Sequence, residues 1–81
     1  MTKKEQFVTL VQTAAIVESL TRKDWPSNQP KLSITAAIAV STAMEVTEAQ
    51  IPEDIMGACN DLIAHVYDNT FPKPPWLIGI I

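Results

Sequence analysis

The stretch from Pro52 to Asp68 reads PEDIMGACNDLIAHVYD and carries the strongest helical signal in the chain. Pro52 suits the first position of a helix, and Glu53 and Asp54 complement the positive end of the helix dipole. The large apolar residues recur at spacings of three and four and form one stripe on a helical wheel: Ile55, Met56, Cys59, Leu62, Ile63, Val66 and Tyr67. We therefore predict a helix over residues 52–68 whose apolar stripe faces a core.

A second helix is predicted upstream, over residues 3–20. Thr2 and Glu5 have the spacing of a capping box, in which each residue satisfies a backbone donor of the other. One face of this helix is apolar and carries Phe7, Leu10, Val11, Ala14 and Val17. Ile16 and Leu20 lie on the far side, where they either contact another part of the chain or meet another subunit.

A third helix is predicted over residues 33–46, with Ser33 as its N-cap. Its alanines form a face of small residues that lets a neighbouring helix approach closely. Residues 32–40 also contain enough β-branched side chains in alternation to form a strand instead. We expect the helix, because the alanines and the length of the segment favour it.

These segments predict an all-α fold: a small three-helix domain over residues 1–70 and an extended, proline-rich, apolar C-terminal tail over residues 71–81. With 81 residues, the chain has room for one domain. The expected core consists of Phe7, Leu10, Val11, Ala14, Ile38, Val40, Ile55, Cys59, Leu62, Ile63 and Val66.

The tail is the first candidate contact element. Three prolines between Pro72 and Pro75 make it stiff and extended. An apolar run follows, and it needs to dock on its own domain, on a second copy or on a foreign protein. Trp25, in a polar stretch with Pro26, is either part of the core or an exposed aromatic anchor. The candidate partner-binding residues are Trp25, Trp76, Leu77, Ile78, Ile80 and Ile81.

Charge and cysteine content restrict the partners and the compartment. The net charge of −3 and the scattered lysines and arginines argue against direct binding of nucleic acid. A single cysteine, Cys59, cannot form an intramolecular disulfide, so we expect a reducing, cytoplasmic compartment. No signal peptide is expected, and the longest apolar stretch is too short and too polar to span a membrane.

The sequence offers little for catalysis. Cys59 and His65 lie six positions apart and point to different sides of the predicted helix, so they cannot act as a nucleophile and base. Asp61 and His65 have a spacing of four, which we interpret as a solvated surface pair. We expect no enzymatic activity, no metal and no cofactor.

The sequence therefore favours a small non-enzymatic protein-interaction module that occupies a surface of a larger protein. An inhibitor, an adaptor or an accessory subunit would act in this way. Small acidic chains of this kind are common among phage and mobile-element proteins that act on host proteins, which is an analogy of size and composition. The alternative is a structural helical protein that forms homodimers or larger homo-oligomers.

Overall fold

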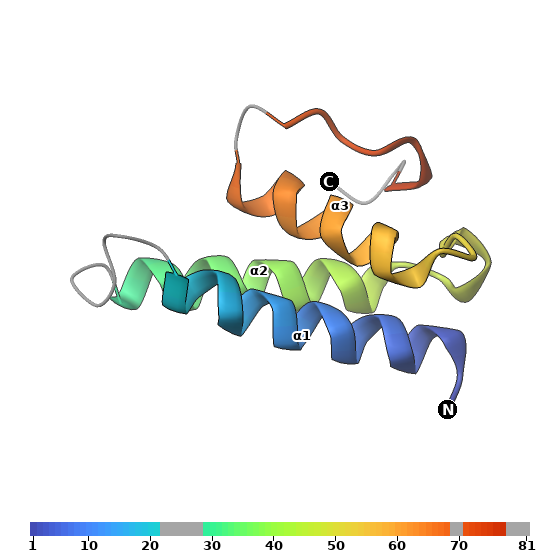
Figure 1. The fold of residues 1–81 in the computed structure, drawn as a ribbon, viewed down its shortest axis with the longest axis horizontal. Coiled ribbons are helices and arrows are strands. Elements are labelled where there is room, and N and C mark those ends of the chain that lie inside the picture. The colour runs from blue at the N-terminus through green and yellow to red at the C-terminus, as the bar shows by residue number, and fades with distance from the viewer. Residues whose placement is uncertain (22–28, 69–70, 78–81) are drawn as a thin grey trace.

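The computed structural model describes residues 1–21, 29–68 and 71–77, with residues 20, 21 and 29–33 described by their backbone alone. These residues form three α-helices and two short 3-10 helices: α1 (Lys3–Thr21), α2 (Gln29–Glu45), η1 (Glu48–Gln50), α3 (Ile55–Tyr67) and η2 (Pro75–Leu77). They contain no strand, so the predicted all-α class is confirmed and a strand over residues 32–40 is wrong. In Figure 1, α1 and α2 lie side by side and run in opposite directions, and α3 packs against both.

Helix α1 begins where the capping box predicts. The backbone amide of Thr2 donates to Oε1 of Glu5 at 2.8 Å, and the amide of Glu5 donates to Oγ1 of Thr2 at 3.1 Å. Two hydrogen bonds from Thr2 hold the pKa of the Glu5 carboxyl below its ordinary value of 4.5. The bond from the Thr2 backbone amide has the larger effect, and the bond from its side chain the smaller.

The other two helices begin elsewhere than predicted. Helix α2 starts at Gln29, ahead of Ser33, and includes Pro30 in its first turn. Proline is tolerated there because the first amides of a helix have no intrahelical acceptor. Helix α3 starts at Ile55 rather than Pro52, because Asp54 is its N-cap and accepts a hydrogen bond from the Gly57 amide at 3.0 Å.

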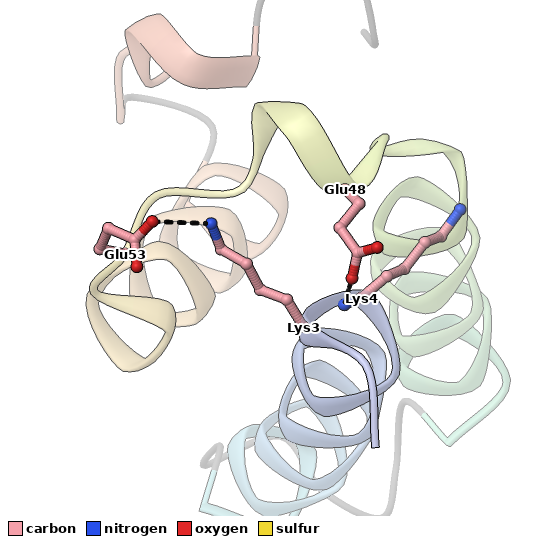
Figure 2. Close-up of polar contacts among 4 residues, drawn as sticks. All are labelled: Lys3, Lys4, Glu48 and Glu53. Carbon is pink, nitrogen blue, oxygen red and sulfur yellow. Dashed lines mark hydrogen bonds and ion pairs between the residues drawn. The ribbon is translucent and has the colours of Figure 1, made fainter.

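The connection between α2 and α3 is tied back to the start of α1 (Figure 2). The Glu48 carboxylate accepts a hydrogen bond from the backbone amide of Lys4 at 3.0 Å. Nearby, Nζ of Lys3 lies 3.4 Å from Oε1 of Glu53, whose side chain is fully exposed. Glu48 thus satisfies a free donor in the first turn of α1 and places negative charge at the positive end of the helix dipole.

The core lies between α3 and the inner sides of α1 and α2. Five predicted core residues are buried, namely Phe7, Val11, Cys59, Leu62 and Ile63, and Leu10, Ala14, Ile55 and Val66 pack partly buried against them. Val40 is half-buried. Ile38 was expected in the core but is 47% exposed, and Val17, expected on the inner face of α1, is 54% exposed.

Alanines of α2 occupy the place expected for Ile38. Ala39 and Ala43 are fully buried, and Ala36 packs against the same core. Small side chains at these positions allow α1 and α3 to approach α2 closely. The chain therefore buries the small face of α2 and leaves its larger isoleucines outside.

Candidate interaction surface

The beginning of the tail packs on its own domain. Leu77 is fully buried in the core, and the ring of Trp76 contacts Phe7 edge to face with centroids 5.8 Å apart. Nε1 of Trp76 donates to Oδ2 of Asp61 across 3.4 Å. The two described candidate residues of the tail therefore make contacts within their own chain, against α1 and α3.

An extended conformation is wrong for the end of the described tail, because Pro75–Leu77 forms the 3-10 helix η2. The Leu77 amide donates to the Pro74 carbonyl at 3.0 Å, which closes this turn. The remaining predicted contact residues lie outside the described residues: Trp25, Ile78, Ile80 and Ile81.

A different apolar surface is exposed on the α1–α2 pair. Ile16 is nine residues from Phe7, and Ile34 is nine residues from Ala43, which places each about 180° around its helix from a buried residue. Ile16 is 54% exposed and Ile34 is 62% exposed. We call the surface opposite the core the outer face; its residues, all exposed, are Thr9, Gln12, Thr13, Ile16, Ile34, Ala37, Ile38, Ser41 and Met44.

None of these nine residues is charged, but the exposed Glu5 and Glu45 lie on the same sides of α1 and α2, four residues from Thr9 and Ser41. No Asp, Glu, Lys or Arg occurs from Gln6 to Val17 or from Ile34 to Met44. Exposed helix surfaces ordinarily carry charged residues, and depletion of charge is the compositional mark of the centre of a protein interface. The outer face therefore shares a low content of charged residues with the centres of protein interfaces.

A groove lies at one end of the outer face, between the start of α1 and the end of α2. It has a volume of about 430 Å³ and includes Thr9 and Met44 of the outer face among its lining residues. The others are Met1, Thr2, Lys4, Glu5 and Val8. The groove makes this end of the outer face concave, and Lys4 and Glu5 place one charge of each sign in its lining.

The groups considered for catalysis are not brought together. Cys59 is 1% exposed, and burial raises the pKa of its thiol above the ordinary 9.0, which keeps it protonated and unreactive. The predicted pair of Asp61 and His65 is wrong: Asp61 accepts from Trp76, and Nδ1 of His65 is buried without a hydrogen-bond partner. Within residues 1–21, 29–68 and 71–77, no three His, Cys, Asp or Glu side chains are grouped to hold a metal ion.

Sequence reasoning missed most of the outer face, because it placed Ile38 in the core and named only Ile16 and Leu20 as apolar residues on a far side. The signal that marks it is the absence of Asp, Glu, Lys and Arg over residues 6–17 and 34–44. None of the described helices is both long enough and apolar enough to cross a bilayer. Comparison of the chain with protein-family models, curated proteins and solved structures gave no match.

Proposed function

We propose that this protein is a small non-enzymatic interaction module that binds the surface of a larger protein through its outer face. The supporting observation is the set of large apolar side chains there, Ile16, Ile34, Ile38 and Met44, each of which is about half exposed. Covering apolar area is favourable by about 25 cal/mol per Å². An inhibitor, an adaptor and an accessory subunit would each use such a surface to occupy a larger partner.

Site-specific photo-crosslinking in the native host tests this proposal. A photoreactive residue is placed on the outer face, as Ser41→p-benzoylphenylalanine, and on the exposed side of α3, as Asn60→p-benzoylphenylalanine. We expect an adduct with a larger protein from position 41 and none from position 60. No adduct with a larger protein from position 41, or equal adducts from both positions, would contradict the proposal.

The captured protein is then purified and titrated against two variants. Ile34→Glu places a charge on the outer face, whereas Met56→Glu places the same charge at a comparably exposed position on α3. We expect the first to weaken binding at least about a hundredfold, since the buried charge lacks a partner, and the second to leave it unchanged. Equal affinities for the two variants would count against the outer face as the contact surface.

A self-assembling structural role is the second candidate. The exposed apolar side chains of the outer face support it too, because a second copy would remove them from water as a larger partner would.

A further inference from the structure

We draw no further inference here: the strongest candidate, the apolar outer face of the α1–α2 pair with its exposed Ile16, Ile34 and Ile38, carries nothing beyond the proposed function, because nothing in the structure shows what covers it.

Discussion

The indole ring of Trp76 meets the ring of Phe7 edge to face, with centroids 5.8 Å apart and ring planes at 86°. Phe7 lies in the first helix and is fully buried, so this contact joins the two ends of the chain through the core. Edge-to-face aromatic pairs contribute about 0.5–1.5 kcal/mol beyond the area that they bury. The contact explains how an apolar segment that follows three prolines is kept out of water as far as Leu77.

Trp76→Ala should lower the free energy of unfolding by about 2–4 kcal/mol, because it removes the cover of Phe7 and leaves a space beside the core. Urea denaturation measures this change. Met56→Ala, at an exposed position of α3, should change stability by less than about 0.5 kcal/mol. A loss below about 1 kcal/mol for Trp76→Ala would show that the tail does not dock on α1.

Mutations of Gly57 and Asp54 should have non-additive effects on stability. Alanine is favoured over glycine in a helix by about 1 kcal/mol. A Cβ atom at Gly57, however, would clash with Oδ2 of Asp54, so Gly57→Ala displaces the carboxylate that caps α3. We therefore expect Gly57→Ala to leave stability nearly unchanged, because the lost cap offsets the better helix former.

A double-mutant cycle with Asp54→Ala and Gly57→Ala tests whether the clash with the cap causes the neutral effect. In an Asp54→Ala background there is no cap to displace, so Gly57→Ala should stabilise the protein by about 1 kcal/mol. The free energies of unfolding of the four proteins give the coupling. Additive effects at the two positions would show that the glycine serves no purpose in the cap.

Glu48 and Glu53, the two carboxylates in Figure 2, should differ in how much they contribute to the free energy of unfolding. Glu48→Ala should cost about 1 kcal/mol, because the Lys4 amide loses its acceptor at the start of α1. Glu53→Ala should have no measurable effect, since its contact with Lys3 is 3.4 Å long and its side chain is fully exposed. Thermal or urea unfolding of both variants tests the difference, and a larger loss for Glu53→Ala would contradict the account.

Cys59 should make stability fall in alkaline solution. Burial raises the pKa of its thiol above 9.0, so the unfolded chain releases this proton first as pH rises through 9. Stability contributed by the neutral thiol is therefore complete below pH 9 and declines above it. Between pH 8 and pH 10 the wild type should lose more stability than Cys59→Ala, and a thiol reagent at pH 8 should modify the wild type only after unfolding.

Features of the fold that depend on local residue spacing could be predicted from the sequence. Thr2 and Glu5 mark the start of α1, because capping acts within one turn. The apolar stripe of α3 faces the core except at Met56, which was predicted in the stripe but is 56% exposed. The start of α2 was missed because Pro30 is compatible both with a loop and with a first helical turn. The bond between Lys4 and Glu48 joins residues distant in sequence, and no local pattern indicates such a pair.

The candidate surface was predicted less well than the fold. Periodicity shows that α2 has two apolar faces but does not show which one the chain itself covers. Packing decided this in favour of Ala39 and Ala43, which left Ile34 and Ile38 outside. The tail was expected to hold the surplus apolar area, yet Trp76 and Leu77 pack against their own domain. Among the described residues, exposed large apolar side chains lie on the outer face.

The most direct test of the outer face is a methyl NMR spectrum of the isotope-labelled chain, recorded while the larger protein captured from position 41 is added. The account predicts that the methyl signals of Ile16, Ile34, Ile38 and Met44 shift, while those of the buried Ile63 and the exposed Met56 stay in place. Signals that shift at Met56 but not at Ile34, or no shift at any of these residues, would contradict it.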